Sequence, residues 1–257
     1  MPSISIITAT LNSSATLVDC VQSVIRQGKD VEHLIMDGGS ADPTLDIAYR
    51  YGNQLRIYSE PDDGIYGAMN KGIKMARGEI IGILNADDYY PTKDVLPRVE
   101  EVFEDESVQA CYGDLVYVDA DNKEKVTRYW KAGDYDAKKF YRGWMPPHPT
   151  FFVRASVYEQ YGGFNLELGT AADYELMLRF LLKHEIKAAY LPMVMVHMRT
   201  GGASNASVSN RLAANRNDRK AWQVNGLKPY PWTLYVKPLR KVGQWWKPGE
   251  RLKGKGF

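Results

Sequence analysis

Acidic, amide and glycine residues gather behind four short apolar segments in the first third of the chain. They occupy residues 8–12, 37–42, 60–64 and 85–88. Ligands of open α/β sheets bind beyond the carboxyl ends of the strands. Because Asp, Asn and Gly are also ordinary turn residues, each group alone has a structural explanation. Four such groups at one sheet edge favour a polar binding site.

Asp87 and Asp88 are adjacent carboxylates, which repel each other unless a cation or hydrogen-bond donors neutralise them. A hard divalent cation, bound by one or two carboxylates together with substrate phosphates, supplies that neutralisation. The chain has no G-x-x-x-x-G-K-[ST] loop, and no G-x-G-x-x-G follows its first apolar segment. A nucleotide site here would therefore depend on side chains and a metal ion.

Apolar periodicity places these polar groups between alternating strands and helices. The expected strands span residues 3–8, 31–36, 55–58 and 79–84. The expected helices span residues 17–25, 43–51, 65–76 and 94–103. Repeated β-α units of this length predict an α/β fold with a mostly parallel sheet flanked by helices on both faces.

The second half of the chain is less regular. Strands are expected at residues 111–118, 125–129 and 188–196. Residues 144–152 are rich in proline and predict a loop that enters a strand. Residues 173–183 carry apolar side chains at helical spacing and predict a helix.

The 257 residues suit one large α/β domain, or one domain with an appendage. With 44% hydrophobic and 25% charged residues, the composition excludes a disordered chain. Cys20 and Cys111 are too few for a disulfide framework or a zinc finger. The first residues predict a strand and not a signal peptide, and no apolar run is long enough to predict a transmembrane helix.

The last thirty residues differ in composition from the rest. Residues 228–257 contain eight Lys or Arg and one Glu, a net charge of +7, whereas the whole chain carries +2. Trp232, Tyr235, Trp245 and Trp246 lie among these cations. Such a mixture suits the headgroup region of an anionic membrane, and a tail folded back on the domain is the alternative. The acidic remainder of the chain and the lack of a recognition motif argue against a nucleic-acid partner.

Six stretches follow one another in order over residues 3–205. They are ISIITATLNSSATL, DGGSADPT, EPDDGIYGAMNKGIKMARGEIIGILNADD, HPTFFVR, GGFNLELGTAADYELMLR and MRTGGAS. In order and spacing they resemble the family 2 glycosyltransferases, which are inverting enzymes with a GT-A fold. The resemblance implies a bacterial enzyme that builds cell-surface polysaccharide from nucleotide-activated sugars.

The resemblance assigns the early loops to the sugar nucleotide. Thr8, Asn12 and Asp37 would surround the base and ribose, and Ser40 would support the loop that carries Asp37. Asp63, Asn70 and Lys71 would flank the donor.

The segment Asn85-Ala86-Asp87-Asp88 occupies the place of the family's D-x-D motif. By the resemblance, Asp87 would hold ribose or sugar hydroxyls, and Asp88 would bind the Mg²⁺ or Mn²⁺ that bridges the diphosphate. Three positions depart from the family pattern. The first acid of the motif is Asn85, the second acid of the D-D-G-S loop is Gly38, and the acid before Asp173 is Ala172.

Asp173, in the segment AADYE, matches the family's general base. It would remove the proton of the acceptor hydroxyl as that oxygen attacks the anomeric carbon. One in-line displacement would convert an α-linked donor into a β-linked product. A helix N-cap is the structural alternative for Asp173.

Three further side chains are weaker candidates. His148, flanked by prolines, is expected to contact the acceptor or the donor sugar, unless it serves only a loop hydrogen bond. Trp144 is favoured as a core aromatic, with stacking on an acceptor sugar as the alternative. His197 follows the last strand, where some GT-A enzymes supply a metal ligand.

The sequence thus predicts residues 1–105 as the nucleotide-sugar half, residues 106–225 as the acceptor half, and residues 226–257 as the tail. The expected reaction transfers a sugar from a UDP-sugar, with metal, to a saccharide or lipid-linked saccharide at the cytoplasmic face of the plasma membrane. A non-catalytic scaffold or glycan-binding module of the same fold is one alternative. A sugar-nucleotide pyrophosphorylase is another, although TATLNSSAT lacks the glycine-rich basic loop that it needs.

Overall fold

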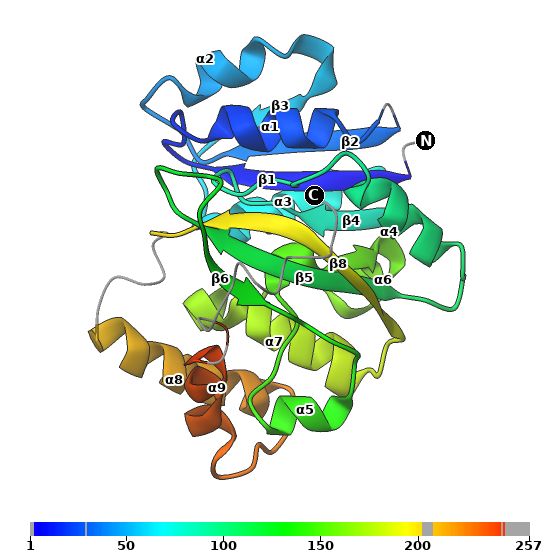
Figure 1. The fold of residues 1–257 in the computed structure, drawn as a ribbon, viewed down its shortest axis with the longest axis vertical. Helices are drawn as coiled ribbons and strands as arrows, with labels where there is room; N and C mark the ends of the chain where they lie inside the picture. Colours follow the sequence, from blue (N-terminus) through cyan, green and yellow to red (C-terminus); the bar gives the residue numbers. More distant parts are fainter. Residues whose placement is uncertain (1–2, 29, 202–207, 243, 245–257) are drawn as a thin grey trace.

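The computed structural model describes residues 3–28, 30–201, 208–242 and 244. One sheet runs through this part of the chain in the order β3-β2-β1-β4-β7-β5-β6, and β8 pairs with β5 (Figure 1). The strands are β1 (Ile4–Thr10), β2 (Val31–Asp37), β3 (Arg56–Ser59), β4 (Ile80–Ile83), β5 (Ala110–Val118), β6 (Val126–Trp130), β7 (Phe152–Arg154) and β8 (Ala188–Arg199). The helices are α1 (Leu17–Ile25), α2 (Thr44–Tyr49), α3 (Ile65–Met75), α4 (Val95–Phe103), α5 (Ala137–Tyr141), α6 (Ala155–Tyr161), α7 (Ala172–Leu178), α8 (Val208–Val224) and α9 (Thr233–Val242).

The four N-terminal strands are parallel, as the β-α alternation predicted. β1 pairs with β2 and β4, and β2 pairs with β3. The register places Thr10 opposite Asp37, and Asp37 opposite Ser59. The three strands therefore end side by side, and the loops that follow them start at one edge of the sheet.

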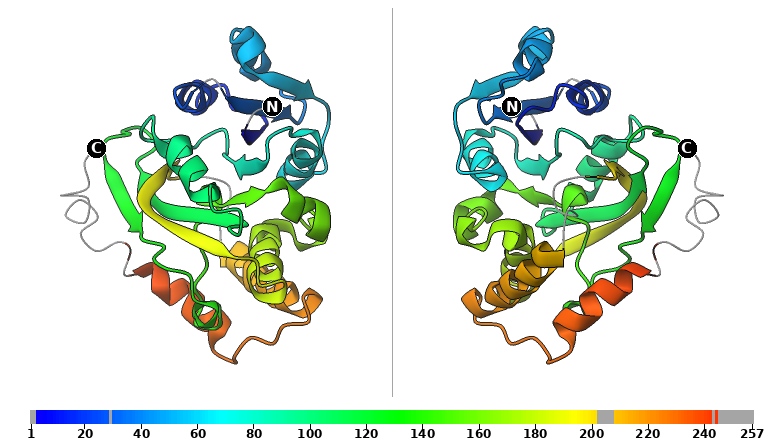
Figure 2. Two further views of the ribbon diagram at one scale, coloured as in Figure 1. Left: turned by 90° about the vertical axis from the view of Figure 1, so that its right-hand side faces the viewer. Right: turned by 90° about the vertical axis from the view of Figure 1, so that its left-hand side faces the viewer.

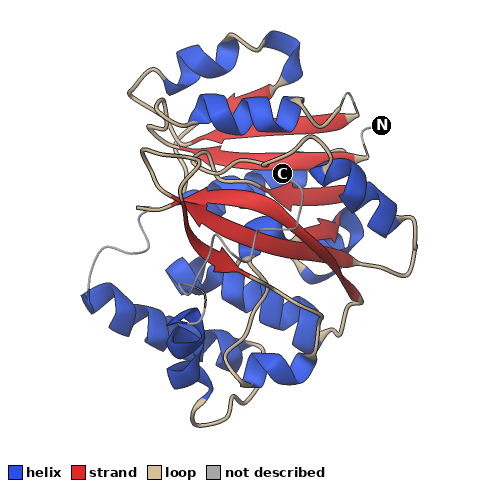
Figure 3. Ribbon diagram, in the orientation of Figure 1, coloured by secondary structure: helices blue, strands red, loops and turns tan. Residues whose placement is uncertain are grey.

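Both faces of this sheet are covered by helices (Figures 2 and 3). Alternation along β1 sends Ile4 and Ile6 to one face, where α1 and α4 pack. Ile7 and Ala9 point to the other face, where Met69 of α3 packs. Sandwiching between two helical layers explains why every residue of β1 is buried.

The second half continues the same sheet. β7 runs antiparallel to both β4 and β5, and β6 runs antiparallel to β5, while β8 runs parallel to β5. The sheet therefore passes without a break across the division expected at residues 105 and 106. The expected α/β class with a mostly parallel nucleotide-binding sheet is confirmed, and the antiparallel strands belong to its second half.

The helix expected at residues 173–183 is real, but its second half has a different geometry. Helix α7 ends at Leu178, and residues Arg179–Lys183 form a π-helical turn. The backbone N–H of His184 closes this turn by donating to the carbonyl of Arg179, 3.0 Å away. Helices α5, α6 and α8 were not expected from the sequence.

The first part of the expected tail packs on the domain. In α9, Thr233 is fully buried and Leu234 is 4% exposed. The ammonium of Lys237 lies 2.7 Å from a carboxylate oxygen of Asp218 in α8. The folded-back alternative thus describes α9, whereas residue 243, Trp245, Trp246 and the rest of the tail lie outside the described residues. No helix in the described part of the chain is long and apolar enough to cross a membrane.

Candidate active site

Asp37, the last residue of β2, organises the loops at the sheet edge. Its carboxylate accepts hydrogen bonds from the backbone N–H groups of Gly39 and Ser40, each at 3.0 Å. The hydroxyl of Ser59, at the end of β3, donates to the same carboxylate at 2.7 Å. The hydroxyl of Ser40 donates as well. Asp37 therefore joins the loop after β2 to the end of β3.

These bonds determine the charge of Asp37, which is only 1% exposed. Burial alone would raise the pKa of its carboxyl group. The hydrogen bonds from Ser40, Ser59 and Gly39 outweigh burial, and they hold the pKa below its usual range. Asp37 is thus an anion at neutral pH, with its oxygens already engaged by the protein.

Asn12 links the loop after β1 to the loop after β2. The side-chain oxygen of Asn12 accepts a hydrogen bond from the backbone N–H of Ala41 at 2.9 Å. The backbone N–H of Asn12 donates to the Ser40 hydroxyl at 2.8 Å. The backbone of Asn12 has φ of 50°, a left-handed conformation that asparagine tolerates better than most residues. The two loops therefore form one connected rim.

The loop after β3 contributes a charged cluster. The ammonium of Lys71 in α3 lies 2.8 Å from Glu60 and 2.5 Å from Asp62. Lys71 remains about one-third exposed, while the neighbouring Asp63 is exposed to solvent. Asp63, in the loop after β3, and Lys71, in α3, therefore both lie at the surface near this loop.

Asp88 is fully buried at the end of the loop after β4. Its Oδ2 accepts a hydrogen bond from the Asn85 amide at 3.1 Å, whereas its Oδ1 has no hydrogen-bond partner among the described residues. Burial, and then the charge of Asp87, raise the pKa of Asp88 well above its usual value. Asn85, the residue that departs from the family motif, thus supports the carboxylate expected to bind metal.

Two residues of β8 contact the segment that carries these acids. Arg199 donates to the backbone oxygen of Asp87 at 2.6 Å and forms an ion pair with Asp19 of α1. His197 exchanges backbone hydrogen bonds with Tyr89, and its Nδ1 lies 3.3 Å from the Tyr89 hydroxyl. Burial lowers the pKa of His197 to about 4, so its ring is neutral at pH 7.

A divalent cation fits the chemistry of this segment when a ligand completes its coordination. The described residues hold no group of three His, Cys, Asp or Glu side chains arranged to bind a metal alone. A buried Asp88 oxygen without a partner is, however, the kind of acceptor that a cation satisfies. Mg²⁺ in particular is commonly held by one or two carboxylates together with substrate phosphates. The fit therefore depends on a phosphate-bearing ligand.

A cavity that is open to solvent lies beside these loops. Asn85, His148 and Asp173 are among the polar residues that line it, and these three come from segments far apart in the sequence. His148 Nδ1 lies 3.3 Å from Asp173 Oδ2, and the Asp173 side chain is 16% exposed. The structure thus brings the expected base and the expected acceptor histidine together.

Asp173 lies within the first turn of α7 and is not its N-cap. The N-cap is Ala171, which makes no side-chain capping bond. Asp173 Oδ1 accepts a hydrogen bond from the adjacent N–H of Tyr174 at 2.7 Å, and Oδ2 faces His148. The structural alternative of a capping role therefore does not describe this carboxylate.

Three expected site residues have other contacts. Thr8 is fully buried inside the sheet, with its hydroxyl 2.9 Å from His33 Nε2. The side-chain amide of Asn70 donates to the backbone oxygen of Phe164 at 2.9 Å and accepts from the backbone N–H of Phe164 at 2.7 Å. Trp144 is 5% exposed, and its indole N–H donates to Ala132 at 2.9 Å, so it is a core aromatic. The core-aromatic alternative thus describes Trp144, and the donor-binding roles of Thr8 and Asn70 stay predictions.

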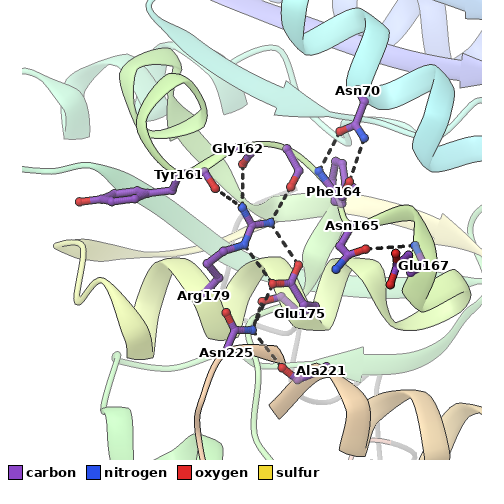
Figure 4. Close-up of polar contacts among 11 residues, drawn as sticks. Asn70, Tyr161, Gly162, Phe164, Asn165, Glu167, Glu175, Arg179, Ala221 and Asn225 are labelled. Carbon is purple, nitrogen blue, oxygen red and sulfur yellow. Dashed lines mark hydrogen bonds and ion pairs between the residues drawn. The ribbon is translucent and has the colours of Figure 1, made fainter. Parts of the chain in front are cut away.

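Sequence reasoning missed the network that holds the segment carrying Phe164 (Figure 4). The Arg179 guanidinium donates to the backbone oxygens of Tyr161, Gly162 and Gly163 and pairs with Glu175 at 3.0 Å. Glu175, 3% exposed, also accepts from the Asn225 amide at 3.1 Å. The feature of the sequence that could have indicated this network is the i, i+4 spacing of Glu175 and Arg179, which suits an ion pair on a helix. Asn70 bonds the backbone of Phe164, and Arg179 bonds the backbone of residues 161–163. Together they hold in place the segment that carries Phe164, which lines the cavity.

The order of these loops along the chain agrees with a known protein family. The model of the family described as Glycosyl transferase family 2 matches residues 5–162, more than half of the chain. The chain belongs to this family.

Curated relatives agree with the family. The chain is 34% identical over 218 residues to the PGL/p-HBAD biosynthesis glycosyltransferase of Mycobacterium bovis, and the alignment covers 82% of each protein. It is 30% identical over 200 residues to the chondroitin synthase of Pasteurella multocida, which covers 74% of this chain and 20% of the synthase. The chain is thus a glycosyltransferase of glycan biosynthesis.

Solved structures show that the GT-A type fold is shared. TarS 1-349 from S. aureus, in complex with UDP-GlcNAc, matches with a TM-score of 0.67 at 18% identity, over 91% of this chain and 69% of TarS. The mannosyltransferase PcManGT from Pyrobaculum calidifontis, in complex with GDP-Man and Mn²⁺, matches with a TM-score of 0.65 at 16% identity, over 100% of this chain and 76% of the other.

Proposed function

We propose that this family 2 glycosyltransferase transfers a sugar from a UDP-sugar to an acceptor hydroxyl with inversion, and that Asp173 is the general base. The observation that carries the proposal is the cavity shared by Asp173 and Asn85. One residue belongs to the expected donor motif and the other is the expected base. A donor sugar and an acceptor hydroxyl would meet at the polar end of this cavity, beside Asn85 and Asp173.

The rim of loops around Asp37 is the proposed nucleotide site. Asn12 and Ser40 connect the loops after β1 and β2, and Asp37 holds them against β3. Such a cross-linked rim costs little ordering entropy when a ligand binds. Lys71, paired with Glu60 and Asp62, lies at the same edge and would flank the donor. TarS with UDP-GlcNAc supports a uridine nucleotide, and PcManGT with GDP-Man keeps guanosine as an outcome of the test.

Asp88 is the proposed metal ligand, and Asp87 lies beside it. A bound Mg²⁺ or Mn²⁺ would supply Lewis-acid stabilisation to the departing diphosphate. The buried, unpartnered Oδ1 of Asp88 supports this role, and so does the Mn²⁺ in the PcManGT complex. His197 remains a weaker candidate ligand, because its contacts lie with Tyr89.

The proposed chemistry is one displacement. The acceptor oxygen attacks the anomeric carbon from the face opposite the diphosphate, and the bond from that carbon to the diphosphate oxygen breaks with its electron pair. Asp173 receives the proton of the acceptor hydroxyl. His148, 3.3 Å from Asp173, orients the carboxylate and can bind an acceptor or donor hydroxyl. An α-linked donor then gives a β-linked product.

A thermal-shift titration with UDP, GDP, dTDP and CMP, each with and without Mn²⁺, tests the donor half of this proposal. A ligand at about 100 times its Kd stabilises the folded state by about 2.7 kcal/mol. We expect UDP to raise the melting temperature with Mn²⁺ and the Asp88→Asn variant to lose the metal dependence. If none of the four nucleotides shifted the melting temperature, the result would favour the non-catalytic scaffold or glycan-binding module.

We also propose that the protein lies at the cytoplasmic face of the plasma membrane, where a lipid-linked saccharide would reach it. Tyr230, Trp232 and Tyr235 are 49, 55 and 63% exposed. The Tyr230 and Trp232 rings are 5.1 Å apart, and Lys228 beside them is exposed. Aromatic rings and cations together suit the headgroup region of an anionic bilayer.

A further inference from the structure

The cavity beside Asp173 has an unusually apolar lining for a site that takes sugars. Its polar lining residues are Asn85, His148 and Asp173 together with the hydroxyl-bearing Tyr66 and Tyr158, and the other seven lining side chains are aliphatic, phenylalanine or methionine. Met69, Phe151, Leu176 and Met177 are each at most 4% exposed, so they are part of the packed core. Sugar hydroxyls placed against such a wall would lose their hydrogen bonds to water without replacement.

The wall is also held in place before any ligand binds. Tyr66 of α3 packs against Phe164 with ring centroids 5.1 Å apart. The amide of Asn70 fixes the Phe164 backbone, and Arg179 fixes the residues before it. A preformed cavity with such an apolar lining is typical of a site that binds an organic group.

The mouth of the cavity is apolar as well. Ile65, the first residue of α3, lines the cavity and is 49% exposed. An exposed isoleucine alone would be ordinary, but this one continues the apolar lining to the surface. An apolar group could therefore enter from solvent along a continuous apolar surface.

We propose that the acceptor carries an apolar aglycone, an alkyl or aryl group, which fills this cavity while the attacked hydroxyl faces Asp173. The proposal deepens the proposed function and rests on it, because the hydroxyl must meet the same base. The polar end of the acceptor meets His148 and Asp173, and its apolar end meets α3, α6 and α7. Such an acceptor is a glycolipid-like or aryl glycoside molecule, as opposed to a free saccharide.

Calorimetric titration of the full chain, with UDP and Mn²⁺ present, tests this directly. The probes are methyl, butyl, octyl and phenyl β-glucosides, all below their micellar concentrations, so that only the aglycone varies. Each methylene that enters the cavity should tighten binding about fourfold, equivalent to about 0.8 kcal/mol. We expect octyl or phenyl glucoside to bind at least tenfold more tightly than methyl glucoside, and the better of the two identifies the aglycone class.

Two variants of α3 separate the cavity from other apolar surfaces. Ile65→Ser should reduce the preference for the longer aglycone several-fold. Met75→Ser, at the other end of the same helix, should not, because Met75 is 36% exposed and does not line the cavity. Equal binding of methyl, octyl and phenyl glucosides, no binding of any, or equal effects of the two variants would overturn the proposal. The UDP titration without glucosides reports separately on the donor site, so failure of the proposed function would be recognised by the loss of that signal.

Discussion

Asp88, with its buried carboxylate, is the residue on which the proposed metal dependence rests. It is fully buried, and one of its oxygens has no hydrogen-bond partner among the described residues. An ionised carboxylate in such a place is costly unless a cation compensates it. The position is therefore expected to destabilise the metal-free protein and to favour the metal-bound one.

Replacement of Asp88 by Asn should stabilise the metal-free protein at neutral pH. Burial and the charge of Asp87 raise the folded-state pKa of Asp88 well above its usual value. At pH values between the usual pKa and the raised pKa, Asp88 is protonated in the folded state and ionised in the unfolded state. The free energy of unfolding of the wild type therefore falls as pH rises through this range. The advantage of Asp88→Asn should thus be absent below about pH 4 and grow toward neutral pH. Urea unfolding of both proteins with EDTA from pH 4 to pH 8 measures the difference, and parallel profiles would contradict it.

At the scale of elements, the site depends on contacts between segments that are distant in sequence. Asn70 of α3 donates a hydrogen bond to the backbone oxygen of Phe164, and Arg179 donates hydrogen bonds to the backbone oxygens of residues 161–163. These bonds tie α3, α6 and α7 into one wall of the cavity. The same wall carries Asp173 at its edge.

Arg179→Lys should loosen this wall, because lysine cannot reproduce the planar fork that meets three carbonyls and Glu175. We expect a loss of about 1–3 kcal/mol in the free energy of unfolding, since buried acceptors are left without a donor. The exposed pair of Arg98 and Glu101 provides the control, and Arg98→Lys should change stability by less than about 1 kcal/mol. Urea unfolding compares the two, and equal effects would mean that the network carries no special stability.

Local patterns predicted most elements but not the tertiary partners. The strand and helix positions of the first hundred residues follow from apolar spacing, and the loops beyond them meet because the strands are parallel. β1 continues to Thr10, two residues beyond its expected end, so Thr8 lies inside the sheet and not in the loop that follows it. The role of Asn70 could not be predicted, since its partner lies 94 residues away. Helix α8 was missed because its sequence is mostly polar and has little amphipathic pattern.

At the scale of the whole molecule, some described residues of the basic C-terminal segment pack on the domain and others are exposed to solvent. Thr233, Leu234 and Lys237 attach α9 to the domain, so deleting the tail from residue 228 would also remove core contacts. Trp232 and Tyr235 instead face solvent. Substitution of these two aromatics is therefore a cleaner test of membrane contact than truncation.

The double variant Trp232→Ser, Tyr235→Ser should bind anionic vesicles several-fold more weakly than the wild type while keeping its fold. Aromatic rings of this kind locate at the headgroup level of a bilayer. Co-sedimentation with phosphatidylglycerol vesicles measures the partition, and circular dichroism checks folding. Tyr49→Ser on α2 is the matched control, because Tyr49 is 61% exposed and lies outside the tail. Equal partition of all three proteins would show that this aromatic surface has another purpose.

The central claim is that Asp173 acts as the base of a sugar transfer whose donor binds at the neighbouring loops. The direct measurement is the rate of UDP release from the UDP-sugar in the presence of acceptor, for wild type and Asp173→Asn, with UDP affinity measured on both. Asp173 is in α7 without capping it, so asparagine should preserve the fold. We predict a fall of about 10²–10⁴-fold in kcat with UDP affinity unchanged. An Asp173→Asn protein that kept the wild-type rate, or that lost activity only in proportion to lost UDP binding, would contradict the account.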